Sequence, residues 1–197
     1  MQPVDSRERI LQATRARLKS GGILSLRVAD VAKDADTSIT LIYKYYRDRD
    51  GLLAQVLGDM YDEFRQRQMQ RIDRWLSQNE TITFEQYADL TPNPAEETKI
   101  DRDFRLQMLA TALENEELRV RIKKTTNDIH KWTLETLEVA RKKLPIEDQG
   151  FDGRFVSVIM FNMMFVFYDL LDDNKISASE YREMLVSHLR NSARKHR

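Results

Sequence analysis

The sequence predicts an all-α protein, and three observations carry that prediction. Glycine and proline number only six and four in 197 residues, so there are few points at which a helix must end. Apolar residues recur three and four positions apart along most of the chain, and no strand alternation persists. The hydrophobic content of 41% is enough to bury a core, and the length allows one or two domains.

The first helix is expected to begin near Asp5 or Ser6, because Asp5 and Glu8 have the spacing of a capping box. The helix runs through Ile10, Ala13, Thr14 and Leu18. Gly21 and Gly22 should then end the helix, since glycine is favoured just past a helix end.

Residues 25–53 hold two short helical patterns separated by a tight polar turn at Asp36 and Thr37. The first pattern has an apolar set near the 3.6-residue period, which can bury one side of a helix. That set is Leu26, Val28, Val31, Ala32 and Ala35.

The second pattern begins at Ser38, which is placed to cap a helix. Ile42 and Tyr46 lie four residues apart and can face inward. Other faces of this helix carry Thr40, Tyr43 and Lys44. Spacing alone leaves two interpretations: a helix-turn-helix that binds DNA, or an ordinary three-helix bundle with a solvated polar face.

A long fourth helix of about 25 residues should follow, with Asp48 as its cap and an apolar series from Leu53 to Leu76. The segment 78–83 then breaks the helical pattern. A short helix is expected at 84–90.

Asn93 can cap the next helix, because Pro94 directly after it suits the first helical position. That helix should end near Leu113. A further long helix is expected at 116–144, where Pro145 stops it.

Residues 155–171 are apolar on all sides, which predicts a buried helix with more than one neighbour. Within this segment, the nearly continuous apolar run covers residues 155–168 and is bounded by Arg154 and Asp169. It is well short of the ~20 residues that a membrane span needs. Ser177 with Glu180 caps a final helix, and a partner subunit could cover the apolar face that remains.

Composition narrows the function further. The net charge is zero, but residues 1–50 carry ten Lys or Arg against seven acids, an excess that suits a polyanion such as DNA. The chain has no cysteine and three scattered histidines, and no Gly-rich phosphate loop stands out, so we expect no enzyme, cofactor or metal site. The N-terminus lacks the apolar stretch of a secretory signal, which predicts a cytoplasmic protein.

One set of residues in the N-terminal quarter matches a known family in a single register. The set is Arg9, Ile10, Leu11, Ala13, Gly22, Val28, Asp30, Val31, Ala32, Lys33, Ala35, Ser38, Ile42, Tyr43, Tyr45, Tyr46, Leu52 and Leu53. With these marks, residues 7–53 closely resemble the DNA-binding domain of TetR-type (tetracycline repressor) transcriptional regulators. The rest of the chain is similar to that family only in length and helix order.

The resemblance implies two domains, a helix-turn-helix DNA-binding domain at 1–50 and a helical effector-binding and dimerisation domain at 51–197. It also places the second helix of the motif in the major groove of double-stranded DNA. The residues expected to contact DNA are Arg27, Ser38, Thr40, Leu41, Tyr43, Lys44, Tyr45 and Arg49.

Different contacts are expected of these residues. Thr40, Leu41 and Lys44 are best placed for base edges, where a lysine can donate to guanine and a methyl group can touch thymine. Arg49 would contact phosphate, the alternative being a surface ion pair with Asp50 or Asp48. Tyr43 and Tyr45 are expected to reach phosphates through their hydroxyl groups, whereas Tyr46 is expected to pack in the core.

Several positions depart from the family pattern. Asp36 stands where a turn glycine is usual, so it should adopt a left-handed conformation at some cost. Arg27 replaces a helix-capping Thr and exchanges that cap for a phosphate contact. Arg15 and Arg17 stand where Leu is common, which would thin the local core. Ala29 replaces a base-reading Arg of some members.

The resemblance also implies a pocket for a small, largely hydrophobic effector of unknown identity and a homodimer interface in the last helices. The effector-binding candidates are Phe104, Met108, Trp132, Phe161, Met164, Phe165 and Tyr168, because aromatic and Met side chains make adaptable apolar cavities. The interface candidates are Tyr181, Leu185 and His188.

The function predicted is therefore that of a repressor that binds a near-palindromic operator as a homodimer and is released by its effector. Two alternatives stay open at this point. The chain could be a helical interaction or scaffold protein, or a dimeric DNA-binding protein without an effector.

Overall fold

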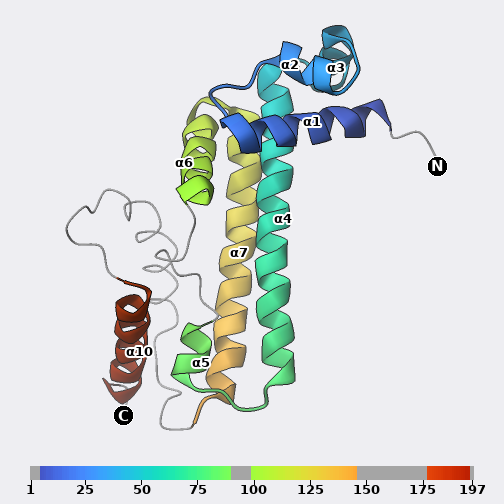
Figure 1. Cartoon of the computed structure of the whole chain (residues 1–197). Coiled ribbons are helices and arrows are strands. Elements are labelled where there is room, and N and C mark those ends of the chain that lie inside the picture. Colours follow the sequence, from blue (N-terminus) through green and yellow to red (C-terminus); the bar gives the residue numbers. More distant parts are fainter. Residues whose placement is uncertain (1–4, 90–98, 146–176, 196–197) are drawn as a thin grey trace. The chain divides into compact units, whose positions relative to one another are not determined.

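The computed structural model describes residues 5–89, 99–145 and 177–195, and every regular element in these ranges is a helix (Figure 1). The chain divides into two compact units, residues 1–65 with 99–126 and residues 66–98 with 127–197. α4 (Arg49–Gln78) contributes to both units, and the domain boundary at residue 50 stays a prediction. None of the helices described is long and apolar enough to cross a membrane.

The first unit begins with the three helices that the sequence predicted, α1 (Ser6–Gly21), α2 (Val28–Asp34) and α3 (Ile39–Tyr46). Asp5 is the N-cap of α1, and Gly22 ends that helix with a φ of 73°, a left-handed conformation that suits glycine. Both predicted helix boundaries are confirmed.

One apolar core holds these helices together and continues into α4, α6 (Lys99–Glu114) and α7 (Glu116–Lys143). The predicted inward residues of α2 and α3 belong to it, and several members are fully buried. Its buried members include Ile10, Leu18, Val31, Ile42, Leu53, Leu57, Met108 and Leu118.

One aspartate and one asparagine side chain fix the start of α4. Asp48 Oδ1 accepts a hydrogen bond from the Gly51 amide at 2.7 Å, which confirms the predicted cap. Asn115 Oδ1 accepts from the Leu118 amide at 2.9 Å, while its Nδ2 donates to the Asp50 carbonyl at 2.8 Å. One buried asparagine thus caps α7 and attaches it to the beginning of α4.

Arg121 on α7 is the centre of a second polar connection in this unit. Its Nη2 donates to Asp59 and to Asp62, each at 2.6 Å, and its Nη1 donates to the Gln55 carbonyl at 3.2 Å. Thr125 Oγ1 also donates to Asp62, at 2.5 Å. The arginine and its acceptors are only partly exposed, so these bonds are stronger than surface ion pairs.

The second unit includes α5 (Phe84–Ala88), the C-terminal parts of α4 and α7, and α10 (Ala178–Lys195). Thr83 and Gln86 form a capping box at α5. The predicted cap of the last helix is confirmed, since Ser177 Oγ accepts a hydrogen bond from the Glu180 amide at 3.2 Å and the Glu180 carboxylate accepts one from the Ser177 amide at 2.7 Å. The apolar core of the second unit includes Leu76, Phe84, Leu137, Ala140 and Leu185.

Two predictions lie outside the described residues. The predicted cap at Asn93 is one of them, since the description resumes with α6 at Lys99. The predicted apolar helix at 155–171 falls wholly within the range that is not described.

Candidate nucleic-acid interface

The helix α3 has a buried side and an open side. Ile42 and Tyr46 are 0% and 4% exposed and belong to the core, as predicted. Because successive residues are 100° apart around a helix, Thr40 and Lys44 lie opposite these two residues, and both are exposed. The side of α3 that faces away from the core therefore presents a hydroxyl group and an ammonium group.

Two further rows flank that open side. Ile39 and Tyr43 form one row and are 41% and 42% exposed. Leu41, which is half-buried, and Tyr45 form the other row. Each row ends in a phenol, which places one tyrosine hydroxyl on each side of the helix. The sequence predicted contacts for both tyrosines but did not include Ile39, although the same helical geometry could have found it.

The beginning of α3 is closed by its own cap. Ser38 Oγ accepts a hydrogen bond from the Leu41 amide at 3.1 Å, so this hydroxyl satisfies the first turn of the helix. The cap predicted from the sequence is confirmed. A contact of Ser38 with DNA stays a prediction.

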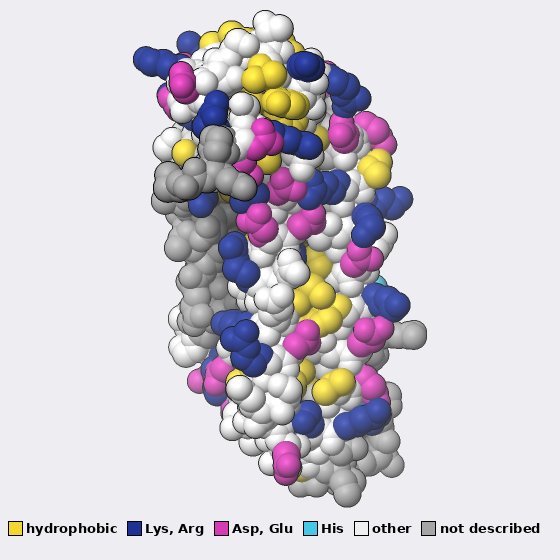
Figure 2. All heavy atoms as spheres, turned by 90° about the vertical axis from the view of Figure 1, so that its right-hand side faces the viewer, with side chains coloured by type: hydrophobic (Ala, Val, Ile, Leu, Met, Phe, Trp, Pro, Cys, Tyr) yellow, Lys and Arg dark blue, Asp and Glu magenta, His cyan; other side chains and the backbone are white. Residues whose placement is uncertain are grey.

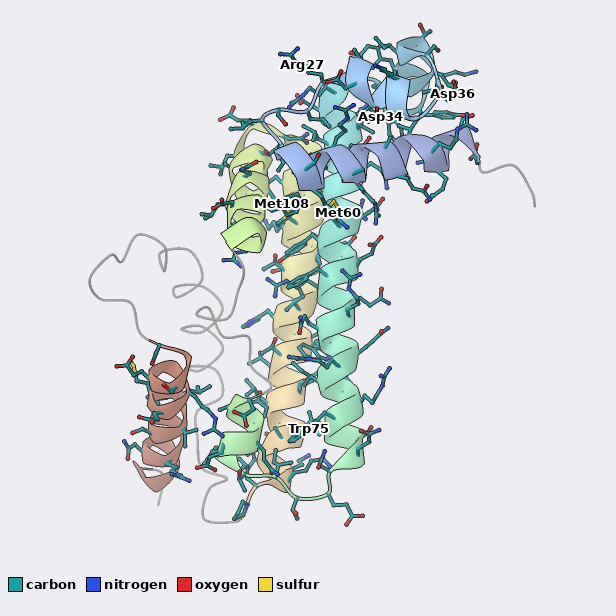
Figure 3. The ribbon with its side chains drawn as sticks, in the orientation of Figure 1. Arg27, Asp34, Asp36, Met60, Trp75 and Met108 are labelled. Carbon is teal, nitrogen blue, oxygen red and sulfur yellow. The ribbon has the colours of Figure 1, made fainter. Side chains whose placement is uncertain are left out.

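Arg27 lies at the start of α2 and has no capping hydrogen bond from its side chain. The side chain is exposed and projects away from the helices, whereas Asp36 lies beyond the other end of α2 (Figure 3). Losing the cap and gaining an exposed cation is what the sequence predicted for this position. The arginine is thus accessible to a phosphate.

Arg49 has partners within the protein that the sequence did not reveal. Its Nε donates to the Leu26 carbonyl at 3.2 Å and its Nη2 to the Ile23 carbonyl at 3.0 Å. Its Nη1 lies 3.8 Å from an Asp50 carboxylate oxygen, the ion pair considered as an alternative. The guanidinium therefore holds the loop between α1 and α2, and a phosphate contact would be an additional role.

The turn between α2 and α3 has the conformation predicted for it. Asp36 has a φ of 47°, in the left-handed region that favours glycine. The preceding Ala35 carbonyl accepts a hydrogen bond from Arg9 Nε at 3.0 Å, which attaches the turn to α1.

Because Asp36 is strained, we expect Asp36→Gly to raise the free energy of unfolding by up to about 1 kcal/mol. The greater freedom of glycine in the unfolded chain offsets part of this gain. Urea unfolding checks the prediction. Asp30→Gly, inside α2, is the matched control and should destabilise by about 1 kcal/mol. Equal destabilisation by both variants would contradict the expected strain at the turn.

The two arginines on α1 pair with acids instead of packing in the core. Arg15 Nη2 lies 2.6 Å from Glu63 and 3.9 Å from Asp59. Arg17 Nε donates to Asp34 at 2.5 Å, and this hydrogen bond lowers the pKa of the Asp34 carboxyl. Both are surface pairs, which contribute little to stability. Figure 2 accordingly shows basic and acidic side chains interspersed along one face, with hydrophobic side chains among basic ones at its upper end.

The predicted effector residues fall into both compact units. Phe104 and Met108 pack in the core of the first unit, and Met108 is only 2% exposed. Trp132 belongs to the second unit, where its Nε1 donates to Asp73 at 3.0 Å. Phe161, Met164, Phe165 and Tyr168 lie outside the described residues. A shared effector cavity therefore stays a prediction.

The predicted interface residues all belong to α10. Leu185 is buried in the core of its own unit, and His188 is half-buried. Tyr181 is part of the helix, but its side chain is not described. Met184 is far more open, at 59% exposed. A contact with a second subunit is thus a prediction for these residues.

A short helix, a strained turn and a capped second helix with an open polar side define a helix-turn-helix protein. Comparison with known proteins agrees. Residues 10–56 match the sequence model of the bacterial regulatory proteins of the tetR family. No curated protein matches the chain by sequence.

Solved structures are similar to the chain over nearly its whole length. A protein of Mesorhizobium loti described as a TetR-family transcriptional regulator is 16% identical with a TM-score of 0.66, covering 94% of each chain. A TetR regulator of Haloarcula marismortui is 18% identical with a TM-score of 0.62, covering 98% of each. FadR of Bacillus subtilis, solved with stearoyl-CoA, is 18% identical with a TM-score of 0.57, covering 92% of this chain and 98% of FadR.

At these identities, the similarity to solved structures establishes the fold alone. The N-terminal match adds the sequence of the DNA-binding domain. Residues 10–56 are therefore similar in sequence to the bacterial regulatory proteins of the tetR family, and the chain shares the fold of the TetR-type structures.

Proposed function

We propose that the protein is a cytoplasmic repressor that binds a near-palindromic DNA operator as a homodimer and is released by a small, largely hydrophobic effector. The observation that carries DNA binding is the open side of α3. Thr40 and Lys44 lie opposite the buried Ile42 and Tyr46, with one tyrosine on each side. A helix of this kind fits the major groove of B-DNA, where its polar side meets base edges and its flanks meet the two backbones.

A homodimer follows from the size of this surface. One short helix reaches too few base pairs for a long operator, so two copies are needed to read it. The two recognition helices would then lie about 34 to 36 Å apart, and the operator would share the two-fold symmetry of the protein. The last helices are the proposed site of pairing.

The proposed effector response is supported by contacts between α6 and the DNA-binding helices. Gln107 on α6 accepts a hydrogen bond from the Ile23 amide at 2.9 Å, directly after α1. Phe104 and Met108 on the same helix pack into the core that holds α1 to α3. A ligand that favours a different position of α6 would therefore change the population of the DNA-binding conformation. FadR, a structural relative, was solved with the fatty acyl ligand stearoyl-CoA.

Selection from random duplex DNA at two salt concentrations tests the central proposal. We expect enrichment of a near-palindromic site with half-sites about one helical turn apart. If a folded protein enriches no sequence even at low salt, the DNA-binding proposal fails and the helices serve another interaction. If a site is enriched, it also supplies the DNA probe for effector screening.

Lys44→Ala and Arg49→Ala should differ in their effects on DNA. Removing the Lys44 ammonium from the open side of α3 should weaken the selected operator about tenfold and random DNA much less. Arg49→Ala should weaken all DNA and reduce the salt slope by about one unit. Because Arg49 also holds two loop carbonyls, its variant should melt at a lower temperature, unlike Lys44→Ala. Wild-type binding by both variants at several salt concentrations would contradict the assignment of α3.

A further inference from the structure

Ile39 is a large apolar residue on the exposed surface of α3. It is the first residue of the helix, directly after the Ser38 cap, and is 41% exposed. It lies four residues before Tyr43, so the two side chains form one continuous row on the same flank. Water cannot hydrogen-bond to the Ile39 side chain, so an apolar partner would stabilise it better than solvent does.

The position in the helix restricts what that contact can be. The N-terminal residues of a recognition helix are the ones that reach base edges. In the major groove, the only apolar group on a base edge is the C5 methyl of thymine. An isoleucine can neither donate nor accept a hydrogen bond, so it gains nothing from guanine, adenine or cytosine edges.

The neighbouring candidates fit this role less well. Leu41 is half-buried and lies on the opposite flank, beside Tyr45. Thr40 is exposed, but its methyl group is smaller and shares the side chain with a hydroxyl group that prefers polar partners.

We infer that Ile39 determines part of the operator sequence by packing against a thymine methyl group. This inference rests on the proposed DNA binding through α3. It adds a specificity-determining residue and names the chemical group that it recognises. The selected half-site should therefore contain a thymine at the position that the N-terminal end of α3 reaches.

The test replaces each thymine of the selected operator, one at a time, with deoxyuridine, which lacks only the methyl group. Affinities are measured for wild type, Ile39→Ala and the milder Ile39→Val at one salt concentration. At one position, the wild-type protein should lose about fourfold in affinity, the effect of exposing one buried methyl group. Ile39→Ala should show no loss there, and Ile39→Val an intermediate loss.

Leu41→Ala is the matched control on the other flank, and Leu24→Ala, at an 88% exposed position of the α1–α2 loop, is a control outside α3. Both controls should keep the wild-type penalty at that thymine. The inference is overturned if the penalty persists in Ile39→Ala, if it disappears in Leu41→Ala instead, or if no thymine replacement matters. In those cases the enriched operator still supports DNA binding. If no operator is enriched at all, the proposed function fails as well.

Discussion

Replacing Gly51 with alanine should lower the free energy of unfolding by about 2 kcal/mol or more. Gly51 lies in the first turn of α4, where a β-carbon would overlap the backbone carbonyl oxygen of Tyr46 at the end of α3. A backbone atom cannot rotate away as a side chain can, so α3 or α4 must shift. The better helix propensity of alanine offsets only part of this cost.

The same shift would displace α3, the proposed recognition helix. We therefore expect Gly51→Ala to lose operator affinity at temperatures where the protein is still folded. Thermal unfolding and operator titration measure the two effects. Asp50→Ala, one residue earlier at an exposed position, is the control and should change stability little. A Gly51→Ala protein with wild-type melting and wild-type affinity would show that the close approach of α3 and α4 does not constrain either property.

Arg121→Ala should also destabilise by about 2 kcal/mol, because it removes the shared partner of two partly buried carboxylates. Asp59 and Asp62 would lose their hydrogen bonds from the guanidinium, and the Gln55 carbonyl would lose its donor. The remaining carboxylates would then repel each other at neutral pH. Urea unfolding near pH 7 measures the loss.

Arg119→Ala is the matched control on the same helix. Arg119 is more exposed and pairs with Glu116 within α7, a surface pair that contributes little. Arg121→Met keeps much of the side-chain volume, so it separates the loss of charge from the loss of packing. Similar unfolding midpoints for Arg119→Ala and Arg121→Ala would contradict a structural role for the Arg121 connection.

Sequence patterns predicted the local structure of the N-terminal helices because the signals there are local. A cap such as Ser38 acts within one turn, and the alternation of buried and exposed residues in α3 repeats over four positions. The left-handed turn at Asp36 followed from its position between two short helices and from the glycine that the family usually has there.

Contacts between distant segments could not be predicted in this way. Arg49 was expected at phosphate, and its additional hydrogen bonds to carbonyls more than twenty residues earlier in the chain were not predicted. Arg15 was expected to thin the local core, and its pairing with Glu63 on another helix was not predicted. An exposed arginine and a paired arginine look the same in sequence, since only the fold brings the acceptor within reach.

The loop between α1 and α2 is held from two directions, by Arg49 at the start of α4 and by Gln107 on α6. This arrangement matters for the design of chimeras in which α1 to α3 are transferred to another protein of the same fold. A chimera cut at residue 50 would carry the loop and Arg49 but leave Gln107 behind, so the transplanted helices would lose one of their two attachments. A functional chimera must therefore include the part of α6 that carries Gln107 together with the helices that Gln107 helps to hold.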